Sequence, residues 1–169
     1  MTTQQFNIDW SKSHCGIKKA PFAALAALMP EVLPILETFP NNPEDFTWDV
    51  KVHLLMPRQY PCIPHWHQDN VPRVNGVQRH DLCDPNDPMY LWVSGAPLTQ
   101  FKHGYVQAQK WHLFNQMDEH RGSPAAEFGW RCFIRATHQS IYLPTKTDRM
   151  DDYLRRHSQV YLDSETYQW

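Results

Sequence analysis

The chain has 169 residues and a mass of 20.0 kDa, with 41% hydrophobic, 20% charged and 13% aromatic residues. This composition is typical of one globular domain and excludes disordered, collagen-like and coiled-coil chains. The formal net charge of −2 gives no indication of a dedicated nucleic-acid binder. The longest apolar run, residues 22–29, is too short to cross a membrane, and the polar residues 1–12 lack the apolar segment of a signal peptide. We therefore expect a single cytoplasmic domain over residues 1–169.

Two residue types are unusually frequent or scarce. The chain has 14 prolines against 6 glycines, which predicts stiff connections, and it has 10 histidines. Histidine is the commonest metal ligand in proteins and a frequent acid-base group. The four cysteines, Cys15, Cys62, Cys83 and Cys132, form no C-x-x-C pair and are expected to be reduced thiols.

The predicted elements begin with a helical segment. After an irregular or strand-containing entry, apolar residues recur at helical spacing over residues 20–39. Pro30 and Pro34 each remove a backbone donor, so this segment is either one kinked helix or two short helices in series. From residue 47 the pattern changes, because Trp48 and Val50 alternate with polar neighbours as in a strand. Strands are expected over residues 47–55, 89–94, 99–102, 105–109, 113–120 and 130–137.

The order of these elements predicts the fold class. A helical segment in front of about seven short strands indicates a mainly β chain with an N-terminal helix, an α+β protein built as a sandwich or a small open barrel. The β core is expected over residues 47–137. It contains a long loop at 70–88, and long loops are often functional. The tail, residues 138–169, contains a predicted polar helix at 148–157.

His67 and Asp69 are the first candidate metal ligands. At positions i and i+2 of a strand, their side chains point to the same face. One further histidine would complete a 2-His-1-carboxylate triad, which binds Fe(II) and leaves three coordination positions open. A single His-x-Asp occurs by chance in so His-rich a chain, so the motif is meaningful only with its context.

That context lies about 50 residues further along the chain. His120 ends the predicted strand 113–120, and Arg131 follows 11 residues later, the length of one turn between adjacent antiparallel strands. Arginine is suited to a bidentate grip on a carboxylate. Arg135 shares a strand face with Arg131, because the two lie at i and i+4.

The order His-x-Asp, distal His and Arg one strand later resembles the Fe(II)/2-oxoglutarate-dependent oxygenase superfamily. The resemblance covers residues 48–137 and implies a double-stranded β-helix, the jelly-roll or cupin-like barrel. It implies His67, Asp69 and His120 as metal ligands and Arg131 as the residue that grips 2-oxoglutarate. The implied chemistry is oxidative decarboxylation of that cosubstrate with O2 to succinate and CO2, coupled to hydroxylation or demethylation of a polar primary substrate that the sequence does not identify.

Several cosubstrate and substrate contacts stay open. Arg135 rivals Arg131 as the cosubstrate anchor. Thr99 and Gln100 are candidate polar contacts from a neighbouring inner strand. In this superfamily the loop after His-x-Asp borders the substrate, which here is the loop at 70–88.

Alternative metal ligands also stay open. His65-x-His67 resembles the ligand pair of cupins that bind Mn, Ni or Zn, although no Glu follows it before Glu119. His112 and His138 rival His120, and His80-x-x-Cys83 lacks the two further ligands of a structural zinc site. A second hypothesis is therefore a cupin-like metal enzyme that does not use 2-oxoglutarate, and a third is a non-enzymatic jelly-roll module.

Overall fold

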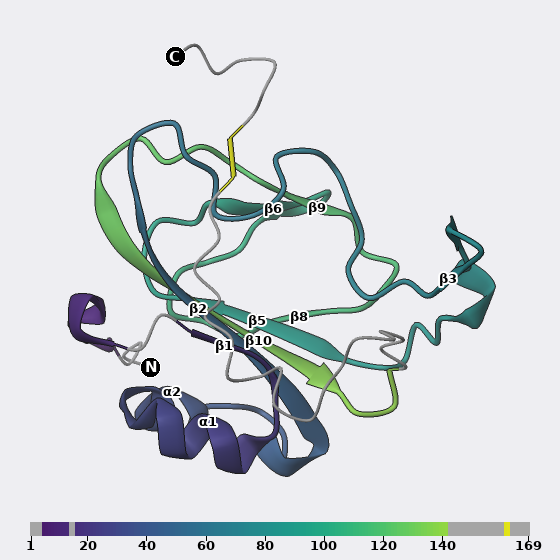
Figure 1. Ribbon diagram of the computed structural model, residues 1–169, viewed down its shortest axis with the longest axis horizontal. Helices are drawn as coiled ribbons and strands as arrows, with labels where there is room; N and C mark the ends of the chain where they lie inside the picture. Colours follow the sequence, from purple (N-terminus) through teal and green to yellow (C-terminus); the bar gives the residue numbers. More distant parts are fainter. Residues whose placement is uncertain (1–4, 14–15, 142–160, 163–169) are drawn as a thin grey trace.

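The structure is a computed structural model that describes residues 5–13, 16–141 and 161–162. Figure 1 shows a central sheet with the N-terminal helices α1 and α2 on one side and the small strands β6 and β9 on the other. The chain is mainly β with short helices and antiparallel pairing, as the sequence predicted. Within the described ranges, no helix is both long and apolar enough to cross a membrane.

Two facing sheets form the β core of the described residues. The larger sheet has the order β1-β2-β10-β5-β8 and the smaller one the order β7-β6-β9. One further backbone contact adds to the smaller sheet, because His67 and His120 form an isolated antiparallel bridge beside β9. The bounds of the larger sheet are β1 Gly16–Ala20, β2 Phe46–Leu55, β5 Met89–Val93, β8 His112–Phe114 and β10 Gly129–His138. Those of the smaller sheet are β6 Thr99–Phe101, β7 Gly104–Tyr105 and β9 His120–Gly122.

The N-terminal segment resolves into two short helices rather than one kinked helix. Helix α1 ends where Met29 donates its N–H to the carbonyl of Leu25, because the next residue, Pro30, has no N–H to continue the ladder. The bounds are α1 Phe22–Leu28, a 3-10 turn η2 at Pro30–Val32, and α2 Leu33–Leu36. Further 3-10 turns are η1 Trp10–Lys12, η3 Pro43–Asp45 and η4 His80–Leu82.

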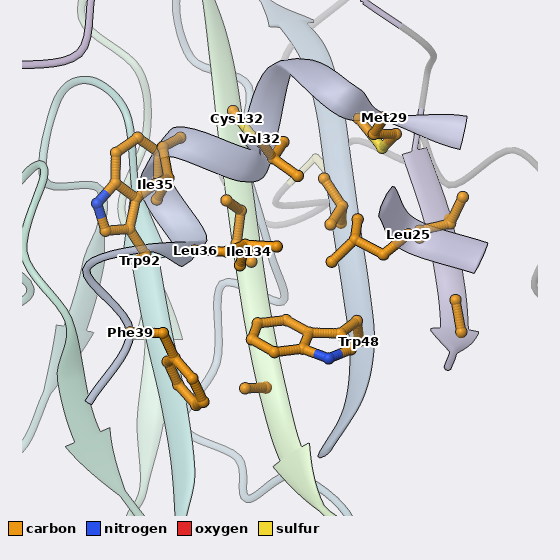
Figure 2. Close-up of a cluster of buried hydrophobic side chains, with 14 of the residues drawn as sticks. Leu25, Met29, Val32, Ile35, Leu36, Phe39, Trp48, Trp92, Cys132 and Ile134 are labelled. Carbon is orange, nitrogen blue, oxygen red and sulfur yellow. The ribbon is translucent and has the colours of Figure 1, made fainter. Parts of the chain in front are cut away.

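The helices cover the apolar face of the larger sheet. Trp48 and Val50 of β2 and Ile134 of β10 are fully buried against α1 and α2 in one hydrophobic cluster (Figure 2). Because side chains alternate across a strand, Asp49 and Arg135 project from the opposite face. Asp49 is also buried, so both faces of the central strands are covered and their charged face lies inside the protein.

One predicted strand was wrong, and the error lies beside the candidate site. Residues 113–120 form two elements, because β8 ends at Phe114 and His120 begins β9. The residues between them turn the chain: Asn115 N–H donates to Asp118 Oδ2 at 2.9 Å, and Met117 N–H donates to Asn115 Oδ1 at 2.8 Å. Asn and Asp side chains bond to nearby backbone groups in this way and thereby end strands.

Four other expectations are also corrected or left untested. Strands β9 and β10 are not adjacent partners, because β9 pairs with β6 while β10 pairs with β2 and β5. The loop 70–88 has structure of its own, a hairpin of β3 Arg73–Val74 and β4 Val77–Gln78 followed by η4. The predicted strand 105–109 shrinks to β7, and the predicted helix 148–157 lies outside the described residues.

Gly122 provides a test of how the small sheet is packed. A Cβ at this position would lie 2.6 Å from the backbone oxygen of Cys62, and the Gly122 N–H donates to Ile63 O at 2.8 Å. We expect Gly122→Ala to lower the free energy of unfolding by about 1–3 kcal/mol, because the clash is with backbone that must shift. Urea denaturation measures the change. Gly129→Ala is the matched control, since its Cβ would meet nothing within 4 Å; equal stability of both variants would contradict this packing.

Candidate metal centre and adjoining cavity

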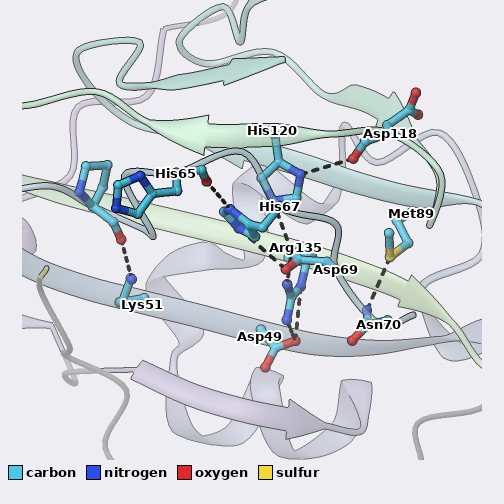
Figure 3. A network of polar contacts seen from close by, with 11 residues as sticks. Asp49, Lys51, His65, His67, Asp69, Asn70, Met89, Asp118, His120 and Arg135 are labelled. Carbon is cyan, nitrogen blue, oxygen red and sulfur yellow. Dashed lines mark hydrogen bonds and ion pairs between the residues drawn. The ribbon is translucent and has the colours of Figure 1, made fainter. Parts of the chain in front are cut away.

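The structure brings His67, Asp69 and His120 together at the inner side of the small sheet. One ligand atom from each lies within 4.8 Å of the others. His120 Nε2 is 3.3 Å from Asp69 Oδ2, and His67 Nε2 is 3.9 Å from Asp69 Oδ1 (Figure 3). The backbone bridge of His67 to His120, with both N···O distances at 2.9 Å, holds the two imidazoles side by side.

Backbone carbonyls orient both imidazoles. His67 Nδ1 lies 2.8 Å from His65 O, and His120 Nδ1 lies 3.3 Å from Asp118 O. A carbonyl can only accept, so each Nδ1 carries a hydrogen, and Nε2 is the ring nitrogen of each histidine that is available to a metal. This arrangement of outer partners is the usual one for metal-ligating histidines.

Arg135 fixes the third ligand. Its Nη1 donates to Asp69 Oδ2, and its Nη2 lies 2.8 Å from Asp49 Oδ2 (Figure 3). The other Asp49 oxygen accepts the Lys19 N–H at 3.1 Å. Arg135 therefore bridges two carboxylates, and this engagement leaves Arg131 as the better candidate for an exogenous anion.

The local charges favour the forms that bind a metal. Burial by itself would raise the pKa of Asp69, but the Arg135 guanidinium outweighs it and holds that pKa well below its usual range. Burial, aided by the charges of His120 and Arg135, lowers the pKa of His67. The site thus holds an ionised carboxylate beside a neutral imidazole at neutral pH, which is the protonation state that metal ligation requires.

A cavity of about 190 Å³ opens in front of the three residues. Apolar side chains such as Leu91, Phe114 and Phe133 line it together with Lys51 and Thr99. Lys51 projects from β2, is 4% exposed and donates from Nζ to Pro61 O. Burial lowers the pKa of Lys51 to about 8.

Sequence reasoning missed Asp49 and Lys51. Both occupy the polar positions of the alternating strand, where a solvent-facing role is the simplest interpretation. The signal that could have found them is their shared face: on the paired strands, Asp49 is opposite Arg135 and Lys51 is opposite Phe133. Once Arg135 is placed inside, its cross-strand neighbours must be inside as well.

Arg131 is buried with part of its hydrogen-bonding capacity unused. It is 3% exposed, and its Nη2 donates to Thr99 Oγ1 at 3.1 Å. Its Nε and Nη1 have no hydrogen-bond partner among the described residues. Burial lowers the pKa of Arg131 to about 10. Each unsatisfied buried donor costs about 1–3 kcal/mol, so this guanidinium is suited to receive an anion.

The other predicted contacts lie elsewhere. Gln100 is on the opposite face of β6 from Thr99, and its Oε1 accepts from Arg121 Nε at 2.9 Å. The structure therefore does not bring Gln100 to the cavity. The ring of His65 is exposed, and only its backbone carbonyl reaches His67.

The rival histidines are also placed apart from the cluster. The His112 ring packs at a tilt against Phe101 with ring centroids 4.5 Å apart, and His138 bonds to Ser140 at 2.6 Å. His80 bonds to Gln68 at 2.7 Å. Among residues 5–13, 16–141 and 161–162, His67, Asp69 and His120 are the one group of three or more side chains close enough to share a metal ion.

Comparison with known proteins leaves the family open. No protein-family model matches the chain, and no curated protein matches it. A crystal structure of a cupin protein from Bacteroides fragilis aligns over 60% of this chain and 75% of its own, with 14% sequence identity and a TM-score of 0.35. At this TM-score the two structures superpose poorly, and the fold of this chain is defined by its own strand pairing.

The burial of Lys51 predicts that the stability of the protein depends on pH. The pKa of Lys51 is about 8 in the folded chain, below the ordinary value of 10.5, so between these pH values the unfolded chain binds more protons than the folded chain. The contribution of Lys51 to the free energy of unfolding therefore rises with pH. We expect the stability of the wild type relative to Lys51→Met to increase by about 1 kcal/mol from pH 7 to pH 9. Urea denaturation at both values measures it. Using the difference between the two proteins cancels the titration of the cysteines, and an unchanged difference would contradict the burial of a charged lysine.

Proposed function

We propose that the protein is an Fe(II)- and 2-oxoglutarate-dependent oxygenase, a hydroxylase or demethylase. The observation that carries the proposal is the closeness of two features. One is the cluster of His67, Asp69 and His120, which lines the metal cavity. The other is the buried Arg131 guanidinium, which lies behind the cavity wall, bonds to Thr99 of that wall and has two donors without a partner among the described residues. A 2-His-1-carboxylate set leaves three positions of Fe(II) open, and a dicarboxylate needs a cation at its far end.

The order of the strands supports a double-stranded β-helix. Going along the chain, β2 lies in the larger sheet, the His67 bridge in the smaller, β5 in the larger, β6 and β7 in the smaller, β8 in the larger, β9 in the smaller and β10 in the larger. Such alternation between two facing sheets is what winds a chain into a jelly roll. It also explains why His120 and Arg131 are near in sequence yet lie on opposite sheets.

The residues in and behind the wall of the metal cavity would then have distinct tasks. His67, Asp69 and His120 would hold the iron, which when bound supplies the activation of O2. Arg131 and the Thr99 hydroxyl would bind the distal carboxylate of 2-oxoglutarate. Arg135 keeps Asp69 ionised and oriented.

The walls of the cavity would keep water from the reacting groups. Leu91, Phe114 and Phe133 line it, and Leu91 and Phe114 are almost fully buried. A cavity with few water molecules strengthens the electrostatic interactions inside it. The hairpin β3–β4 in the loop 70–88 follows Asp69 directly, which makes it our proposed border for a polar primary substrate.

Anaerobic titration with Fe(II) and then 2-oxoglutarate tests the proposal. We expect a visible charge-transfer band when the cosubstrate chelates the iron. His67→Ala should weaken iron binding by at least about tenfold. Arg131→Met should keep the iron and weaken 2-oxoglutarate binding by about 10- to 100-fold, because charge-assisted hydrogen bonds are worth about 1.5–3 kcal/mol.

His65→Ala is the matched control for His67→Ala. Its ring is exposed and only its backbone carbonyl bonds to His67, so the band should be unchanged. Loss of iron in this variant would favour the cupin-like ligand set of His65, His67 and His120. Iron binding without the band would contradict the use of 2-oxoglutarate, and no iron binding would contradict the metal site itself.

A further inference from the structure

Lys51 brings a positive charge into the lining of the metal cavity. It lies on β2 two residues after Asp49, so both side chains project from the inner face of that strand (Figure 3). Lys51 contributes to the lining of the metal cavity, whereas Arg131 lies behind the wall. The Lys51 side chain is almost fully buried. Burial of an ammonium costs free energy that an anion can offset.

Three contacts hold the Lys51 ammonium at the wall of the cavity. Its Nζ donates to the backbone oxygen of Pro61, and it lies 5.8 Å from the ring centroid of Phe133 and 5.6 Å from that of Tyr161. Both rings line the metal cavity, so the ammonium adjoins the same space as the metal ligands. Burial lowers the pKa of Lys51 only to about 8, and the group therefore stays mostly protonated at pH 7.

The charged side chains in and behind the wall have an excess of positive charge. Arg135 pairs with the carboxylates of Asp49 and Asp69. Among the described residues at this cavity, the cations Lys51, Arg131 and Arg135 thus accompany these two carboxylates. A divalent ion in the metal cluster would increase the positive charge further. Positive charge in a site of low dielectric constant attracts an anion.

Lys51 and Arg131 offer separate positions for two carboxylates. On the paired strands, Lys51 is opposite Phe133, whereas Arg131 is opposite His53, one inward position further along. The proposed function assigns 2-oxoglutarate to Arg131. A second carboxylate in the same cavity would therefore be bound at Lys51.

We propose that Lys51 binds the carboxylate of a small primary substrate in the metal cavity. This inference rests on the proposed function, because it names the class of substrate that the iron site would oxidise. The apolar body of the substrate contacts Leu91, Phe114 and Phe133, which line the cavity. The cavity volume of about 190 Å³ lies below the usual range of ligand pockets, about 300–1,000 Å³, so the substrate is a small molecule.

Titration of the full iron-free chain with 4,4,4-trifluorobutyrate at pH 7, followed by ¹⁹F NMR, tests the anion site. This probe has one carboxylate and a short apolar body. We expect saturable binding, and at least tenfold weaker binding of the neutral 4,4,4-trifluorobutan-1-ol, because charge-assisted hydrogen bonds are the stronger ones. Lys51→Met should weaken carboxylate binding at least tenfold, and its apolar side chain of similar length should preserve the fold.

Lys102→Met is the matched control. The Lys102 side chain is 54% exposed, lies 3.5 Å from Glu119 and does not line the metal cavity, so removal of its charge should leave binding of the probe unchanged. Absence of saturable binding to the wild type would overturn the proposal. So would equal binding of the alcohol, or undiminished binding of the carboxylate to folded Lys51→Met.

A second titration separates a substrate from the cosubstrate. The probe is added to the anaerobic chain loaded with Fe(II) and saturating 2-oxoglutarate. We expect it to bind while the charge-transfer band is retained. We also expect Lys51→Met to lose the probe while its 2-oxoglutarate affinity changes less than threefold. Displacement of 2-oxoglutarate by the probe, or tenfold weaker 2-oxoglutarate binding to Lys51→Met, would contradict the substrate role and assign Lys51 to the cosubstrate.

Failure of the proposed function gives a different result. In that case the charge-transfer band does not form in the wild type even without the probe, and the role of Lys51 toward a primary substrate fails with it. Binding of the probe to the iron-free chain tests the anion site alone, so the two failures are distinguishable.

Discussion

Arg135 joins three parts of the chain through two carboxylates. Its guanidinium, carried by β10, bonds to Asp49 of β2 and to Asp69 of the segment that crosses to the small sheet. A buried charge is tolerated only when it is paired, and removal of one partner of a buried pair costs about 3–5 kcal/mol. The position of Asp69 is therefore fixed by the same ion pairs that tie the sheet together. The geometry of the candidate metal centre depends on this contact, because the Nε2 atoms of both histidines lie close to the Asp69 carboxylate.

The alternation of side chains on β2 and β10 makes this possible. One face carries Trp48 and Ile134 under the helices, and the other carries Asp49 and Arg135 into the interior. In most amphipathic strands the polar face meets water. Here the small sheet covers it, so each inward polar group needs a partner within the protein or a ligand. Within the described residues, Arg135 has two such partners, whereas Arg131 has one hydrogen bond and two unused donors. That difference separates a structural arginine from one suited to binding.

The sequence predicted much of this arrangement. Periodicity identified the helical segment and the long strands near 47–55 and 130–137, and residue chemistry identified His67, Asp69 and His120, which the structure brings together. It failed where the fold depends on pairing between distant segments. Local pattern treated 113–120 as one strand, because the Asn115 turn is a matter of side chains bonding to the backbone. It also placed β9 beside β10, since adjacency in sequence does not reveal which sheet a strand joins. Asp49 and Lys51 were overlooked because a polar strand face alone does not show whether water or protein covers it.

X-ray absorption at the iron edge of the anaerobic Fe(II)-loaded chain would show whether two imidazoles and the carboxylate held by Arg135 form a single metal centre. We expect scattering from two imidazole rings together with oxygen ligands, and from one ring in His120→Ala. Coordination by oxygen alone, by three imidazoles, or by an unchanged set of ligands in His120→Ala would contradict it.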